Sequence, residues 1–280
     1  MAKLVLLGNS VNRLGGGAAW IDVLSDLAAK ADLLARSITG KPLPIVYEYV
    51  VSRTTEGEQA LKTHLATSMR RLRPNSAHER ALTAAGGRLL TTNYDYCFEL
   101  AGGGRRRRAN LDRETTYSAF RRVKVGGREI WYMHGELDAP RTIMLGLHQY
   151  AGYLQKLRAY LTARPKTSPF RAGVVDFEHL DTRFSWVDLF LRDDVHIGGL
   201  TMDYVEIHLW WLIAYKLRLR RDLQCGTTHF YHFRTPKDGA GVQTRLEMLR
   251  DLGAHVHQVP VRANDWNGAH DRMFDQIADA

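Results

Sequence analysis

The sequence holds three short polar clusters, far apart along the chain, whose residue types could together handle a nucleotide. The first is built around Gly8, where the absence of a side chain lets the backbone approach a pyrophosphate closely. The second holds Asn93 and Asp95. An amide can donate to and accept from a carboxamide or a ribose hydroxyl, and an acidic group can stabilise an electron-deficient sugar. The third holds His134, whose imidazole suits proton transfer near neutral pH.

Each cluster also fits an ordinary structural role. Gly8 does not begin a complete G-x-G-x-x-G pattern, because the glycines at 15–17 follow too late. Asn93 and Asp95 are residue types that also cap helices, and His134 also fits a hydrogen-bonded histidine at a strand end. No cluster alone identifies a site, so what matters is whether the three meet.

Each cluster directly follows a short apolar run, which indicates the strand that would position it. These runs span residues 4–7, 88–91 and 129–133 and are typical of buried parallel strands. Because the carboxyl ends of parallel strands meet at one edge of a sheet, where open α/β folds bind ligands, we expect the clusters to gather there.

Strands and helices alternate along the rest of the chain, which predicts an α/β fold with helices on both faces of a parallel sheet. Further strands are predicted at residues 45–51, 195–197, 229–233 and 255–259. Helices are predicted at residues 18–36, 57–72, 76–85, 97–100, 147–163, 203–219, 242–252 and 269–277. The chain then forms a single domain over 1–280, with a helical insert at 147–192 and a glycine- and arginine-rich loop at 102–112.

The composition suits a globular protein in a reducing cytoplasm. Of the 280 residues, 45% are hydrophobic and 25% charged, and the two cysteines, Cys97 and Cys225, are too few for a disulfide framework or a four-thiolate zinc site. No apolar run is long enough to cross a membrane. The net charge of +9 favours anionic partners, but Arg105–Arg108 and the other arginine runs lack interleaved aromatic residues, so nucleic acid is expected only as an indirect partner.

The order and spacing of the clusters resemble the sirtuin-like family of NAD-consuming proteins. Thr91 to Asp95 is similar to the family's T-x-N-x-D segment, and His134-Gly135 to its H-G pair. Residues 143–145 and Tyr150 look like the strand and tyrosine that follow this histidine. Residues 185–190 and 196–211 look like the late strand, glycine turn and D-x-x-E helix of short bacterial members.

The resemblance implies a Rossmann-like sheet flanked by helices, with NAD⁺ as substrate, and it implies roles for individual residues. Asn93 would orient a water or the ribose hydroxyls, His134 would act as general base, and Asp95 would support the developing positive charge. The residues implied in NAD binding are Gly8, Asn9, Ser10, Asn12, Arg13 and Thr92, with Gly198, Leu200 and Asp203 on the adenosine side.

The chain departs from the family's protein deacylases in two ways. It lacks the two C-x-x-C pairs of their zinc module, whose place the insert at 147–192 takes, and Ser10 replaces the second glycine of their G-A-G turn. It therefore resembles the bacterial anti-phage branch, which implies hydrolysis of NAD⁺ to nicotinamide and ADP-ribose, with no zinc and no other cofactor. The alternatives are a deacylase or ADP-ribosyltransferase, and a non-enzymatic module that binds NAD, ADP-ribose or nucleic acid.

An NAD-destroying enzyme needs restraint, and the sequence shows no evident sensor domain. The resemblance implies a hetero-oligomer with a separate sensor protein, such as a HAM1-like pyrophosphatase, an Argonaute or a HerA-type ATPase.

Overall fold

The computed structural model describes residues 1–34, 38, 40–104, 116–162, 170–171, 174–175, 184–221 and 223–280. The arginine run Arg105–Arg108 lies outside the described residues. So does most of the segment from residue 163 to residue 183, which is the middle of the insert predicted at 147–192. The small strands β5 (Phe170–Arg171) and β6 (Val174–Val175) within that insert pair antiparallel.

The described residues form a seven-stranded, mostly parallel sheet in the order β3-β4-β2-β1-β7-β8-β9. Its strands are β1 (Lys3–Leu7), β2 (Arg88–Thr91), β3 (Arg122–Val125), β4 (Arg128–Tyr132), β7 (Asp194–Gly198), β8 (Thr228–Arg234) and β9 (Ala254–Pro260). Only the edge strand β3 is antiparallel to its neighbour. Numbered along the chain, the six parallel strands take the spatial order 3-2-1-4-5-6 of dinucleotide-binding Rossmann folds.

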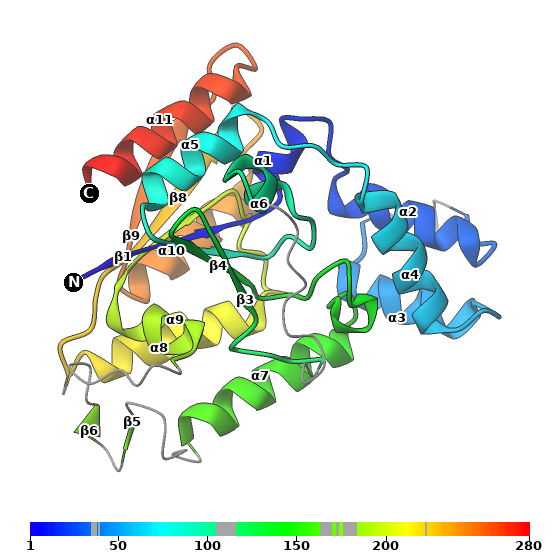
Figure 1. Cartoon of the computed structure of the whole chain (residues 1–280), viewed down its shortest axis with the longest axis horizontal. Coiled ribbons are helices and arrows are strands. Elements are labelled where there is room, and N and C mark those ends of the chain that lie inside the picture. Colours follow the sequence, from blue (N-terminus) through cyan, green and yellow to red (C-terminus); the bar gives the residue numbers. More distant parts are fainter. Residues whose placement is uncertain are drawn as a thin grey trace.

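Helices cover both faces of the sheet, as the sequence predicts (Figure 1). Alternate residues of β1 point to opposite faces: Val5 and Leu7 pack in one core, and Leu4 and Leu6 in the other. The first core also holds residues of α5 (Ser76–Ala85), α6 (Cys97–Ala101) and α11 (Trp266–Asp279). The second holds residues of α7 (Leu147–Thr162), α8 (Trp186–Arg192), α9 (Ile207–Leu219) and α10 (Ala240–Asp251).

Three further helices form a lobe to one side of the sheet (Figure 1). They are α2 (Trp20–Lys30), α3 (Leu43–Arg53) and α4 (Glu58–Met69), and the short helix α1 (Ser10–Arg13) leads from β1 toward them. The 3-10 helix η3 (Pro140–Thr142) packs against α4, and α3 packs against α7. The lobe is thereby attached to the sheet domain beyond the end of β1.

The predicted strand at 45–51 is wrong, because these residues lie in helix α3. Ile45, Val46, Val50 and Val51 are β-branched residues, which favour strands. Yet the buried positions are Val46, Tyr47 and Val50, a helical spacing, and Pro44 sits in the first helical turn, where proline is well tolerated.

Other differences concern element ends and one missed strand. Residues 143–145, expected as a strand, follow η3 without strand pairing. The helix predicted at 18–36 ends at Lys30, and the one predicted at 203–219 begins at Ile207. Strand β3 was not predicted, although Gly126-Gly127 between two alternating runs is a hairpin signal. Within the described residues, no helix is long and apolar enough to span a membrane.

Candidate functional site

The turn after β1 lies against the end of β7, at the point where the strand order reverses. The amide of Gly8 donates to the Gly198 carbonyl (3.1 Å). A Cβ at Gly8 would lie 2.5 Å from the Gly199 carbonyl oxygen and 2.4 Å from the Leu200 side chain, so only glycine fits here. The first cluster and the predicted adenosine-side residues thus meet at the topological switch point, where doubly wound sheets bind their ligands.

Asn93 joins the second cluster to the first. Its buried side-chain amide is 3.5 Å from the Gly8 carbonyl oxygen, and its backbone amide donates to Thr91 Oγ1 (3.0 Å). The neighbouring Thr92 is anchored by its backbone, whose amide donates to the Leu7 carbonyl (3.2 Å). The predicted contact between strand ends is therefore present for β1 and β2.

Asp95 is held in a buried hydrogen-bond network. Its Oδ2 accepts from Asn12 Nδ2 (2.6 Å), and its Oδ1 accepts from the Cys97 backbone amide (2.9 Å) at the start of α6. Asn12 Oδ1 in turn lies 2.9 Å from His78 Nε2 on α5. Both ends of the Asn12 amide and both Asp95 oxygens already make hydrogen bonds. This network therefore supports the strand ends from inside the protein and offers no free polar group to a ligand.

His134 lies just beyond β4, on a turn that requires its glycine neighbour. Gly135 has φ +106°, and a Cβ there would lie 2.3 Å from the Thr142 carbonyl oxygen. The His134 carbonyl accepts from the Met144 amide (2.8 Å), and the Met144 carbonyl accepts from the Tyr94 hydroxyl (2.7 Å). The second and third clusters are thus connected through Met144.

The side chain of His134 contacts residues from the start of α9. Its Nε2 is 3.0 Å from His208 Nε2 and 3.8 Å from Glu206 Oε2. Burial lowers the pKa of His134 to about 3 and places the pKa of His208 well below its usual value. Burial, followed by the charge of Asp203, raises the pKa of Glu206 to about 8. At neutral pH the imidazoles are therefore uncharged.

The other residues predicted to bind NAD differ in exposure and in their hydrogen-bond partners. Asn9 Nδ2 donates to the Ala18 carbonyl (2.8 Å), and Ser10 Oγ is 2.8 Å from His270 Nε2 on α11. Arg13 is exposed at the end of α1. Asp203 is exposed, and its carbonyl accepts from the Trp210 indole (3.1 Å).

The sequence did not predict that His208 and Glu206 surround His134. His208 stands in the apolar first turns of α9, and Glu206 was predicted as part of the D-x-x-E helix start, not as a neighbour of His134; its side chain makes no capping hydrogen bond. A buried histidine within an apolar run is a weak signal of function, and its partner lies 74 positions away in the sequence. The parallel pairing of β4 with β2, of β2 with β1 and of β1 with β7 brings the two segments to the same edge of the sheet.

The chain's two thiols do not fit the zinc module of protein deacylases. Burial, followed by the Asp95 charge, raises the pKa of Cys97, and burial also raises the pKa of Cys225. Both thiols are held protonated, whereas zinc ligands are thiolates, and four would be needed.

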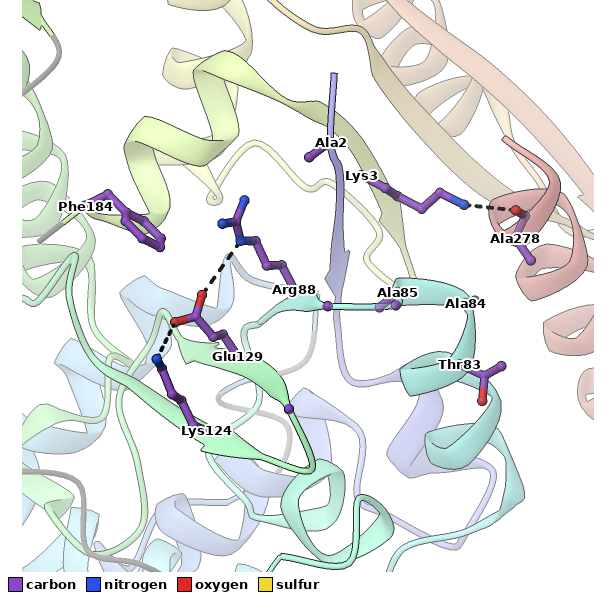
Figure 2. A pocket seen from close by; sticks show the side chains of 13 residues that line it. Ala2, Lys3, Thr83, Ala84, Ala85, Arg88, Lys124, Glu129, Phe184 and Ala278 are labelled. Atoms are coloured by element: carbon purple, nitrogen blue, oxygen red, sulfur yellow. Dashed lines mark hydrogen bonds and ion pairs between the residues drawn. The ribbon is translucent and has the colours of Figure 1, made fainter. Parts of the chain in front are cut away.

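A depression of about 940 Å³ lies at the opposite, amino-terminal edge of the sheet (Figure 2). Its cations have partners: Arg88 and Lys124 both lie 3.7 Å from the Glu129 carboxylate, and Lys3 donates to the Ala278 carbonyl (3.0 Å) at the end of α11. None of the three clusters lines this depression.

Comparison with known families supports the same edge. Residues 87–171 match the family model of the SIR2-like domain. The match covers less than a third of the chain but includes both the Asn93 and the His134 clusters. No curated protein matches the sequence significantly.

Proposed function

The SIR2-like match supports assignment of the chain to the sirtuin-like family, and on this premise we propose that it is an NAD⁺ glycohydrolase. The supporting observation is the convergence of the Gly8, Asn93 and His134 clusters at the carboxyl edge of a sheet with Rossmann strand order. That edge is where such sheets bind dinucleotides.

In the proposed reaction, the bond between ribose C1′ and the nicotinamide nitrogen breaks, and its electron pair neutralises the positive pyridinium ring. A water oxygen bonds to C1′ through an oxocarbenium-like transition state. Asn93 orients this water or the ribose hydroxyls, and His134 acts as the general base that accepts the released proton and passes it to solvent. Asp95, fixed by Asn12 and the Cys97 amide, adds negative potential beside the positive sugar.

The adenosine and pyrophosphate parts of NAD⁺ would lie along the β1 and β7 ends. Gly8 and Gly198 let these strand ends pack closely against Leu200 and Met273, and the exposed Arg13 supplies a charge-assisted donor. Asn9, Ser10, Thr92, Leu200 and Asp203 complete the proposed binding edge.

We further propose that this activity serves as the effector of a bacterial anti-phage system, under control of a separate sensor protein. A HAM1-like pyrophosphatase, an Argonaute and a HerA-type ATPase are the candidate classes of sensor. The absence of a zinc module removes the lobe that forms the acyl-peptide groove of deacylases, which favours water as the acceptor.

The test is nicotinamide release from NAD⁺ by the chain, alone and with its co-purified partner, without acyl peptide. Asn93→Ala and His134→Ala should each lower the rate by at least about 100-fold, the usual scale for loss of a positioning group or general base. Asn267→Ala on the exposed face of α11 and His64→Ala on α4 are matched controls that should retain wild-type rates.

Full activity in both site variants would disprove the residue assignment. Nicotinamide release that depends on acyl peptide would instead identify a deacylase, and tight NAD⁺ binding without turnover in the partner complex would identify a binding module.

A further inference from the structure

The described residues contain two buried groups whose side chains could hold a metal ion. In each group, the potential ligand atoms lie within 4.8 Å of one another. One group is His78, Asp95 and Cys97, and the other is His134, Glu206 and His208. The two differ in whether their polar atoms already have partners.

The first group is satisfied by protein contacts. His78 and Asp95 are joined through Asn12, Asp95 also accepts from the Cys97 amide, and the Cys97 thiol is held protonated by burial. An ion at this place would have to displace existing hydrogen bonds. We therefore assign this group a structural role.

The second group has buried polar atoms without partners. Among the described residues, Glu206 Oε2 and His208 Nδ1 are shielded from solvent and make no hydrogen bond. Leaving such atoms unpaired in the interior costs about 1–3 kcal/mol each. Both face the same small region, because Glu206 Oε2 is 3.8 Å from His134 Nε2 and 4.0 Å from His208 Nδ1.

The spacing of these atoms suits one ion. Two ligands of a tetrahedral zinc ion, each bonded at about 2.0–2.1 Å, lie about 3.3 Å apart. The observed separations are 3.0 Å between the two Nε2 atoms of His134 and His208, 3.8 Å between His134 Nε2 and Glu206 Oε2, and 4.0 Å between His208 Nδ1 and Glu206 Oε2. An ion would replace the hydrogen bond between the two imidazoles and would engage the carboxylate oxygen that now has no partner. The rigid turn at Gly135 and the start of α9 hold the donors in position.

We propose that His134, Glu206 and His208 form a binding site for a divalent transition-metal ion of the zinc type. Two neutral imidazoles and one carboxylate are a donor set that zinc accepts with a fourth position left for water. The Glu206 side chain, 16% exposed, provides the side of the group nearest to solvent and gives up its proton when the ion binds.

Occupation of this site has a consequence that rests on the proposed function. The ion takes the His134 Nε2 lone pair and, by holding the imidazole, opposes its use as a base. Zinc should therefore inhibit nicotinamide release over the same concentration range in which it binds, and a chelator should restore the rate. The site would then act as a metal-dependent brake on the enzyme.

The decisive measurement does not depend on NAD⁺ cleavage. Cobalt(II) is titrated into the full chain, and its visible ligand-field bands are followed, with subsequent displacement by Zn²⁺. One equivalent of bound Co²⁺ with the intense bands of four- or five-coordinate geometry is expected. Glu206→Gln and His208→Gln should each weaken binding by more than about 100-fold, which exceeds the effect of losing a group that only hydrogen-bonds to a metal ligand.

A matched control removes a histidine from the other histidine-rich part of the molecule. His229→Gln on β8 should leave the cobalt spectrum and affinity unchanged. Absence of ligand-field bands in the wild-type chain, or binding by the two site variants equal to that of the wild type, would overturn the metal site.

If the variants fail to fold, anomalous scattering from zinc-soaked wild-type crystals decides, because a peak anywhere except between His134 and Glu206 contradicts the proposal. Loss of NAD⁺ cleavage alone would leave the metal site standing, and loss of metal binding would leave the glycohydrolase proposal standing.

Discussion

Individual residues of the candidate site divide into those held in buried hydrogen-bond networks and those whose side chains reach the surface. Asn12 belongs to the buried group, because its side-chain amide bonds to both Asp95 and His78 in the interior. Asn9, from the same turn, donates only to an exposed backbone carbonyl. Two asparagines that look equivalent in the sequence should therefore differ in their effect on folding.

Asn12→Ala should lower the free energy of unfolding by about 2–4 kcal/mol, since it leaves a buried carboxylate oxygen and a buried imidazole nitrogen without their partner. Asn9→Ala should change it by no more than about 0.5 kcal/mol, as for other surface substitutions. Urea unfolding of both variants in the absence of NAD⁺ measures the difference.

The ligand dependence of these variants provides the cross-check. If Asn12 acted only as a pyrophosphate ligand, Asn12→Ala would unfold at the wild-type urea concentration and lose only its stabilisation by added ADP-ribose. That result would contradict the buried network as the main role of Asn12.

At the scale of elements, strands β7, β8 and β9 carry a row of histidines on one face. His196 and His229 are paired in register and stack with ring centroids 4.6 Å apart, and His229 Nδ1 is 3.0 Å from His257 Nε2. Burial lowers the pKa of His196 and of His229 to about 4, and it also lowers the pKa of His257. Each must therefore be uncharged for the three strands to pack as observed.

This row predicts loss of stability in acid. An unfolded histidine has a pKa of about 6.5, so between about pH 6.5 and pH 4 the unfolded chain binds more protons than the folded chain. Stability is then fully present above pH 6.5 and falls as the pH decreases toward 4, by at most about 1.4 kcal/mol per pH unit for the buried His196 and by less for the partly exposed His229 and His257, whose charges solvent screens. Urea unfolding from pH 7.5 to 4.5 should show this decline.

Replacing the most buried member should reduce the slope. His196→Gln removes one titrating ring, so its stability at pH 7.5 falls but its loss on acidification is smaller than in the wild type. His64→Gln on α4, away from the row, is the control and should keep the wild-type slope. An unchanged slope in His196→Gln would show that acid stability is set elsewhere.

The elements also show where sequence reasoning succeeds and where it fails. The strands at 88–91 and 195–197 were predicted because apolar runs bounded by glycine are read locally. Helix α3 was misread because its β-branched residues favour strands, while its burial pattern is set by packing against α2 and α7. The Glu206 and His208 contacts with His134 depend on strand pairing across the sheet, which no local pattern contains.

At the scale of the whole molecule, the strand order determines which edge can bind a dinucleotide. The chain builds β2 and β4 on one side of β1 and then β7, β8 and β9 on the other, so the strand order reverses between β1 and β7, where such sheets form a ligand-binding crevice. The depression at the other edge is lined by Arg88 and Lys124, which pair with Glu129, and by Lys3, which donates to the end of α11 (Figure 2).

Hydrogen exchange with bound ADP-ribose should distinguish the two edges. The product carries the pyrophosphate and both riboses but has no bond to cleave, so it reports binding alone. Protection is expected in peptides covering residues 8–13 and 198–203, because backbone amides near Gly8 and Gly199 become less accessible when the ligand lies across them. Peptides covering 83–88 and 124–129 at the amino edge should be unaffected.

Protection confined to the amino edge would place the nucleotide in the depression and refute the strand-end site. The Asn93→Ala variant should show weaker protection at the carboxyl edge, because the Asn93 side-chain amide lies next to the Gly8 carbonyl.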